Sequence, residues 1–132
     1  MKARNKEERI LLWLDKSNST LKEIESHIEN EFINTSANRI YFACFYAVTA
    51  FLISINLESK THSGIRTLFG RHLIQANLLD KKFGKFYTEI FDYRKEVDYD
   101  EFTDLEMEDI KSIFEEAKEL VAEIERLLSE KK

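Results

Sequence analysis

The chain lacks proline altogether, and its 132 residues include three glycines and one cysteine. An all-β sandwich needs many turn residues and a glycine-rich nucleotide loop needs clustered glycines, so both are excluded. The single cysteine, Cys44, excludes an internal disulfide and a cysteine-based zinc site. The positive evidence for a fold must therefore come from the spacing of apolar residues.

The chain also lacks a strong excess of one charge. Its net charge of −5 argues against general nucleic-acid binding, although it leaves room for a local basic patch. With 43% hydrophobic and 34% charged residues the composition is that of one globular domain, which can bury roughly 68% of its unfolded surface. Only five apolar residues separate the basic start from Asp15, which is too short for a secretory signal. We therefore expect a cytoplasmic protein.

Apolar spacing predicts helices in the first half of the chain. In the first of them, residues on one helix face recur at steps of three, four or seven: Ile10, Leu14, Leu21, Ile24 and Ile28. Polar residues at 17–20 weaken that pattern but keep its phase. Residues 36–56 are apolar on nearly every side, which indicates the buried centre of a bundle rather than a membrane span.

Three further helices are expected over 62–76, over 80–97 and from 103 onward. The fourth helix carries Arg94 on an apolar stripe, where an arginine must be paired or must face a cleft. The last helix opens with the sequence TDLE at 103–106, which has the form of a capping box. We predict one all-α domain over 1–132, an up-and-down bundle of about five helices.

Several polar residues stand where they can carry chemistry. Arg39 comes one turn before the apolar run, and Arg94 and Asp98 have the i, i+4 spacing of one helix face. The pair is either a structural ion pair or an arginine held by a carboxylate and directed at a phosphate. Tyr99 can stack on a base or cover the core.

A second candidate lies at the start of the third helix, where residues 60–64 read KTHSG. Free backbone N–H groups and hydroxyls at a helix start bind anions, and Lys60, His62 and Ser63 would strengthen such a site. The alternative is an ordinary N-cap by Thr61 or Ser63. The three histidines show no metal-binding spacing, so no metal or cofactor is expected.

These segments resemble the signatures of one family. The sequence NRIYFACFYA at 38–47 is similar to the second-helix signature of HEPN domains, in which an arginine precedes an aromatic and alanine-rich run. The KTHSG turn with LFG at 68–70 resembles the second signature, and Arg94 with Asp98 and Tyr99 resembles the third. The three occur in the family's order within residues 8–128. The chain is thereby identified as a member of that family.

The resemblance implies a small helical bundle from bacteria or archaea, commonly a homodimer. Many such proteins are paired with a minimal nucleotidyltransferase in toxin–antitoxin systems, and several are metal-independent ribonucleases with an Arg-x(4–6)-His motif. Here Arg94 is followed by Asp98 and Tyr99 instead of a histidine. We therefore expect binding of nucleotide or RNA phosphate without a clear catalytic histidine.

The predicted site and partners follow from these arguments. The phosphate-binding set is Arg39, Lys60, His62, Ser63, Arg94, Asp98 and Tyr99. One alternative is a metal-independent endoribonuclease toxin with Arg94 and His62 as candidate catalytic residues; the other is a non-catalytic helical dimerisation or interaction module. Expected partners are a second copy, a minimal nucleotidyltransferase, and nucleotide or RNA, with no membrane.

Overall fold

The computed structural model describes residues 5–98 and 105–130 of the chain. Within those ranges it contains five α-helices and one π-helical turn, η1. Their bounds are α1 Lys6–Glu29, α2 Ile33–Ser54, α3 His62–Phe69, η1 Gly70–Ile74, α4 Lys81–Asp98 and α5 Met107–Glu130. The all-α fold class predicted from the sequence is confirmed.

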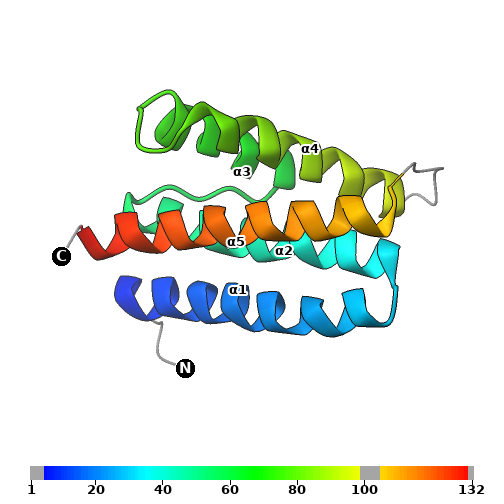
Figure 1. The fold of residues 1–132 in the computed structure, drawn as a ribbon. Coiled ribbons are helices and arrows are strands. Elements are labelled where there is room, and N and C mark those ends of the chain that lie inside the picture. The colour runs from blue at the N-terminus through cyan, green and yellow to red at the C-terminus, as the bar shows by residue number, and fades with distance from the viewer. Residues whose placement is uncertain (1–4, 99–104, 131–132) are drawn as a thin grey trace.

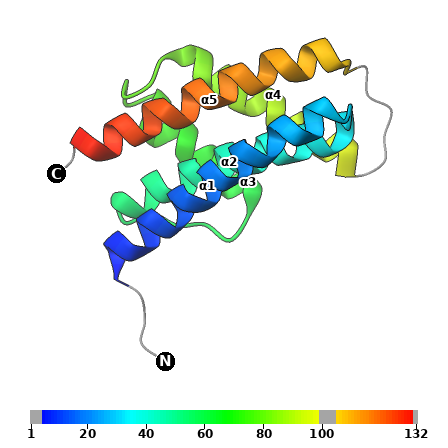
Figure 2. The ribbon, with the colours of Figure 1, turned by 60° about the horizontal axis from the view of Figure 1, so that its bottom comes forward.

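The four long helices alternate in direction along the bundle (Figure 1). α2 returns beside α1, and α5 returns beside α4 after α4 has run in the direction of α1. Seen from a second direction, α1 still lies alongside α2 (Figure 2). α3 and η1 lie before α4 in the chain, and α3 packs against both α2 and α4. This is the predicted up-and-down bundle with a short helical insertion.

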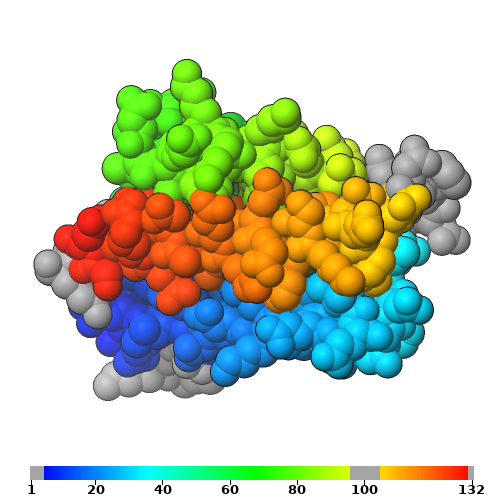
Figure 3. Space-filling model, viewed as in Figure 1, coloured from blue at the N-terminus to red at the C-terminus, as the bar shows by residue number. Residues whose placement is uncertain are grey.

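The central helix is α2, as its composition predicts. It contacts α1, α3, α4 and α5, and Ile40, Cys44 and Phe51 along it are fully buried. On the face drawn in Figure 3, α5 lies between α1 and α4 and covers most of α2. α2 is long and apolar enough to cross a membrane, yet 67% of its apolar window is buried inside the protein. Because each large apolar side chain contributes about 1.5–3 kcal/mol on burial, α2 anchors the other helices.

The polar stretch at 17–20 contributes to the contact between α1 and α2. Ser17 and Thr20 are buried, and Oγ of Ser17 donates a hydrogen bond of 2.7 Å to the backbone carbonyl of Ala43. Thr20 bonds to the carbonyl of Lys16 in its own helix. Both hydroxyls are therefore satisfied, and their small side chains let the two helices approach each other.

Two predicted boundaries are wrong. The third helix does not run unbroken over 62–76, because α3 ends at Phe69 and η1 follows it. α5 begins at Met107 rather than directly after Thr103, since residues 105 and 106 are not helical. The carboxylate of Asp109 accepts a hydrogen bond from the backbone N–H of Glu106 at 2.9 Å, so the cap lies three residues later than expected. Thr103 itself lies outside the described residues.

Candidate functional site

A tight turn at the start of α3 positions His62. Oγ1 of Thr61 accepts a hydrogen bond of 2.9 Å from the backbone N–H of Gly64, which makes Thr61 the N-cap. A Cβ at Gly64 would lie 2.0 Å from Oγ of Ser59, so any larger residue here would displace the Ser59 side chain. The alternative of an ordinary N-cap is thus confirmed for Thr61, and the same cap makes His62 the first residue of α3.

The imidazole of His62 is anchored on α2. Its Nδ1 atom lies 2.8 Å from the hydroxyl of Tyr41, a residue that is fully buried. The His62 ring also packs on Phe45, with 4.6 Å between the ring centroids. A hydrogen bond and a ring contact from consecutive turns of α2 therefore fix the orientation of His62, which is half-buried.

The direction of the Tyr41 hydrogen bond follows from its surroundings. Burial raises the pKa of Tyr41 to about 12, and burial also raises the pKa of Tyr87, so both phenols keep their protons near neutral pH. The buried hydroxyl of Tyr87 has no well-placed partner among the described residues, and its side chain interacts with that of Tyr41. If the Tyr41 hydroxyl accepts a hydrogen bond from the Tyr87 hydroxyl and donates one to His62, both buried hydroxyl groups have an acceptor for their hydrogen atoms. With this direction, Nδ1 of His62 is the acceptor, and a neutral His62 ring would carry its proton on Nε2.

Arg94 reaches the same part of α2 from α4. Its Cζ atom lies 5.6 Å from the ring centroid of Tyr41 and 5.8 Å from that of Phe42. A guanidinium within about 6 Å of an aromatic ring gains roughly 0.5–1 kcal/mol, and more where water is excluded. The Nε atom of Arg94 is buried. The arginine on the apolar stripe of α4 is thus packed against aromatic rings.

Arg39 lies on α2 one turn before Phe42. Its Nε atom donates to Oε1 of Glu23 at 3.0 Å, and its Nη2 atom lies 3.4 Å from Oγ1 of Thr20. The Cζ atom of Arg39 is 5.6 Å from the ring centroid of Phe42. A guanidinium has five N–H donors, so these two contacts with α1 leave Arg39 with donors for another acceptor.

Three of the residues predicted from the sequence therefore meet at the ring of Phe42. The His62 ring centroid lies 5.6 Å from that of Phe42, and the two guanidinium groups contact the same ring. We name the residues Arg39, Tyr41, Phe42, His62 and Arg94 the Phe42 cluster. Guanidinium and imidazole donors around a half-buried aromatic ring can bind a phosphate and stack a base.

The other predicted residues lie at different places. Ser63 follows His62 and is exposed, while Lys60 is exposed on the segment before α3 and lines a separate pocket beside Phe45. Asp98 is the last residue of α4, but its side chain and Tyr99 lie outside what the structure describes. The ion pair between Arg94 and Asp98 therefore remains a prediction.

The described part of the chain contains neither a metal-binding group of side chains nor a reactive thiol. Residues 5–98 and 105–130 contain no group of three His, Cys, Asp or Glu side chains able to hold a metal ion. Cys44 is fully buried, and burial raises the pKa of its thiol. Because the thiolate is the reactive form, Cys44 serves as a small core residue.

Sequence reasoning missed two parts of the site. It quoted Tyr41 and Phe42 within a signature but assigned them no role, although their place one turn after Arg39 in an aromatic run was visible. It also missed Glu23 as the partner of Arg39, because the two residues are sixteen positions apart and no local spacing joins them. The pairing exists only because α1 packs against α2.

Comparisons with known proteins agree with the family that the sequence resembles. The sequence model described as the HEPN domain matches residues 10–127. A protein of Thermotoga maritima named "UPF0332 protein" is 33% identical over 129 residues, which cover 97% of this chain and 98% of that protein.

Two archaeal proteins are also similar, both from Methanocaldococcus jannaschii. "Putative toxin MJ0142" is 30% identical over 96 residues, which cover 73% of this chain and 65% of that protein. "Putative toxin MJ0605" is 29% identical over 102 residues, or 77% of this chain and 75% of that protein. Each match spans most of the helical bundle.

Proposed function

Because this chain belongs to the HEPN domain family, we propose that it is a toxin-type HEPN protein whose Phe42 cluster binds the phosphate of RNA or of a nucleotide. The names of two relatives support the toxin assignment. The observation that carries the binding proposal is that Arg39, His62 and Arg94, from three different helices, contact the single ring of Phe42. Arginine suits this role because its planar fork matches two phosphate oxygens at once.

Isothermal titration with ATP and with short single-stranded RNA tests this proposal. We expect Arg94→Gln to weaken binding at least tenfold, since a charge-assisted hydrogen bond is worth roughly 1.5–3 kcal/mol. Arg126→Gln is the matched control, because Arg126 is an arginine on α5 that pairs with Glu123 and Glu130. Unchanged binding by Arg94→Gln would contradict the proposal.

The interaction-module alternative predicts a different result for the same residue. If Arg94 is structural, its replacement by alanine destabilises the fold by roughly 3–5 kcal/mol, provided that a buried carboxylate partner is left unpaired. Binding to RNA would then be absent in the parent protein as well. Urea unfolding of Arg94→Ala alongside the titration therefore separates the two proposals.

A metal-independent endoribonuclease is the second candidate, favoured by the bond between Tyr41 and His62. This hydrogen bond holds the imidazole of His62 in one orientation beside the Phe42 ring, which Arg94 also contacts. The histidine would transfer a proton during attack by the RNA 2′-hydroxyl, and the arginine would stabilise the charge on the phosphorane-like transition state. RNA cleavage in the presence of a chelator, lost in His62→Ala and in Arg94→Ala, is the expected result. Cleavage that survives both changes would remove these residues from the mechanism.

We further propose that the protein acts in the cytoplasm as a homodimer together with a minimal nucleotidyltransferase. Support for self-association comes from Leu11 and Leu12, adjacent residues of α1 that are 58% and 42% exposed. Analytical ultracentrifugation is expected to show a dimer at micromolar concentration that Leu11→Glu converts to monomer.

Co-purification with a nucleotidyltransferase encoded beside the gene tests the second partner, and the absence of that enzyme from the purified complex would count against the pairing.

A further inference from the structure

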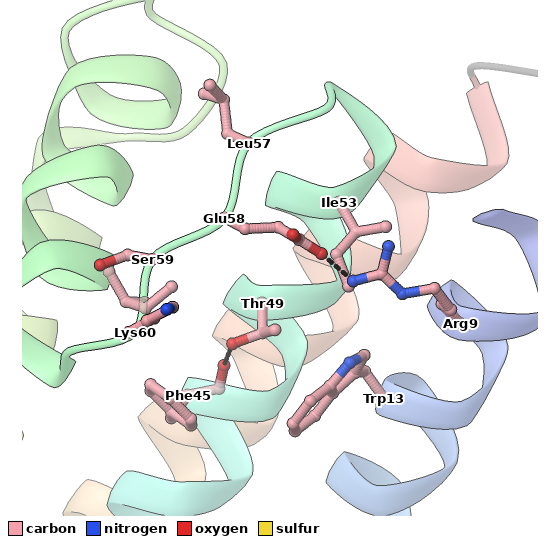
Figure 4. A pocket seen from close by; sticks show the side chains of 10 residues that line it. Arg9, Trp13, Phe45, Thr49, Ile53, Leu57, Glu58, Ser59 and Lys60 are labelled. Carbon is pink, nitrogen blue, oxygen red and sulfur yellow. Dashed lines mark hydrogen bonds and ion pairs between the residues drawn. The ribbon is translucent and has the colours of Figure 1, made fainter. Parts of the chain in front are cut away.

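A groove lies next to the Phe42 cluster, between α1 and the segment 57–60 and above the second half of α2 (Figure 4). Its volume of about 420 Å³ lies within the roughly 300–1,000 Å³ typical of small-molecule sites. The groove is lined by Arg9, Trp13, Phe45, Thr49, Ile53, Leu57, Glu58, Ser59, Lys60 and Ile65.

The floor of the groove is apolar. Phe45, Thr49 and Ile53 are spaced four residues apart on α2 and therefore form one stripe. The hydroxyl of Thr49 donates to the carbonyl of Phe45 in its own helix at 2.8 Å, so it presents no unsatisfied donor. Trp13 from α1 stands at one end of this stripe (Figure 4). A flat, apolar group would fit such a floor.

Basic side chains lie along the rim. Lys60 lines the groove on the side of the 57–60 segment, and Arg9 on the side of α1 forms an ion pair with Glu58 across it. At the Trp13 end, Nζ of Lys16 lies 4.8 Å from the ring centroid of Trp13 and 4.8 Å from that of Tyr46. Of the charged residues that line the groove, Arg9 and Lys60 are basic and Glu58 is acidic. Lys16 adds a third cation beside Trp13, and this balance favours an anionic ligand.

The groove and the Phe42 cluster share a wall. The ring of Phe45 lines the groove, and the same ring lies 4.6 Å from the His62 ring and 6.0 Å from the Phe42 ring, centroid to centroid. A ligand group in the groove would therefore contact the same aromatic side chain as the His62 ring. A base placed there would lie next to a phosphate held by the Phe42 cluster.

We propose that this groove holds a nucleobase of single-stranded RNA, adjacent to the phosphate bound by the Phe42 cluster. Trp13 and Phe45 supply the aromatic surface on which a base stacks, and Lys60 and Lys16 face the phosphates on either side of it. This proposal rests on the proposed phosphate-binding function and adds a base-binding subsite to it. It also explains the position of Lys60, which the Phe42 cluster does not include.

The groove contains its own reporter, because Trp13 is the single tryptophan of the chain. We would titrate the full-length protein with inorganic phosphate, with the dinucleotide ApA and with a short oligoadenylate, and record tryptophan fluorescence. Stacking of a base should quench the emission with ApA and with the oligoadenylate, whereas phosphate alone should leave it unchanged. Quenching by phosphate, or no quenching by a bound oligonucleotide, would overturn the proposal.

Variants then measure the contribution of the groove to affinity, with labelled oligoadenylate and fluorescence anisotropy. Trp13→Leu should weaken binding about tenfold, the effect of losing one stacked base. Lys60→Ala should lower the slope of log affinity against log salt by about one. Lys111→Ala is the matched control, because Lys111 lines a different hollow with residues of α1 and α5. Circular dichroism checks that Trp13→Leu is folded, and Lys60→Ala tests the groove if it is not.

The outcomes separate this proposal from the phosphate site. If the oligonucleotide binds and Arg94→Gln weakens it, but Trp13 emission, Trp13→Leu and Lys60→Ala show no effect, the groove proposal is wrong and the phosphate site stands. If the groove variants weaken binding and Arg94→Gln does not, the phosphate site is wrong. An oligonucleotide that does not bind at all overturns both.

Discussion

The hydroxyl of Tyr41 lies 2.8 Å from Nδ1 of His62, which joins a fully buried tyrosine of α2 to the first residue of α3. Tyr41 has no exposed surface, whereas His62 is half-buried. A core tyrosine thereby holds the imidazole of a half-buried histidine in one orientation. If the Tyr41 hydroxyl donates to Nδ1, a neutral His62 donates through Nε2.

Replacing Tyr41 by phenylalanine removes this hydrogen bond while keeping the ring in place. We expect the tautomer of His62 to lose its bias toward the proton on Nε2, and the free energy of unfolding to fall by about 1 kcal/mol. Long-range ¹H–¹⁵N NMR of the imidazole measures the first effect and urea unfolding the second. Tyr46→Phe is the matched control, because Tyr46 is a half-buried tyrosine of the same helix. An unchanged tautomer in Tyr41→Phe would contradict the assigned direction of the bond.

The protein should lose stability at alkaline pH because of its buried phenols. Burial raises the pKa of Tyr41 from 10.0 to about 12, so between these values the unfolded chain releases its proton and the folded chain retains it. Stability from this group is complete below pH 10 and declines as pH rises toward 12, by about 1.4 kcal/mol per pH unit. Burial shifts the pKa of Tyr87 in the same direction. Urea unfolding across this range should show a shallower decline for Tyr41→Phe, and parallel curves would contradict the prediction.

The two glycines of the α3–η1 region should respond oppositely to alanine. A Cβ at Gly64 would meet Oγ of Ser59 at 2.0 Å and Oγ1 of Thr61 at 2.8 Å, so Gly64→Ala must displace Ser59 and the capping hydroxyl of Thr61. We expect a loss of about 1–3 kcal/mol, in the range for overpacking. Gly70 has helical dihedral angles and nothing within 4 Å of a Cβ, so Gly70→Ala should stabilise by roughly 0.5–1 kcal/mol. Thermal unfolding that ranks the two variants the other way would refute this account.

The contact of Ser17 with α2 gives a fourth stability prediction. Ser17→Ala removes the hydrogen bond to the carbonyl of Ala43 and should lower the free energy of unfolding by about 1 kcal/mol. Ser17→Val adds volume at a fully buried position that contacts α2 and should lower it by about 1–3 kcal/mol. Ser19→Ala on the exposed side of α1 is the control, expected to stay within about 0.5 kcal/mol of the parent. Equal effects at Ser17 and Ser19 in urea unfolding would contradict this packing.

The sequence alone predicted much of the bundle, because helix periodicity is a local property. The all-round apolar character of residues 36–56 identified the central helix, now α2, and the Thr61 turn identified the start of α3. The start of α5 was misplaced because Thr103 to Glu106 has the form of a capping box, yet the chain caps the helix with Glu106 and Asp109 instead. The change at Gly70 was missed because the backbone keeps right-handed helical dihedral angles at Phe69 and Gly70, so no turn residue marks the start of the π-helical turn.

What only the tertiary structure decided is which polar and aromatic residues meet. Arg39 and Arg94 are fifty-five positions apart in the sequence, yet both guanidinium groups lie against the ring of Phe42. The groove beside them combines Trp13 of α1 with Phe45 of α2 and Lys60 of the connecting segment. The amino-acid pattern fixes each helix and its buried face, because backbone hydrogen bonds and side-chain spacing act within a few residues. Contacts between residues that are far apart in the sequence depend on how those faces pack, and the packing depends on all the helices of the core together.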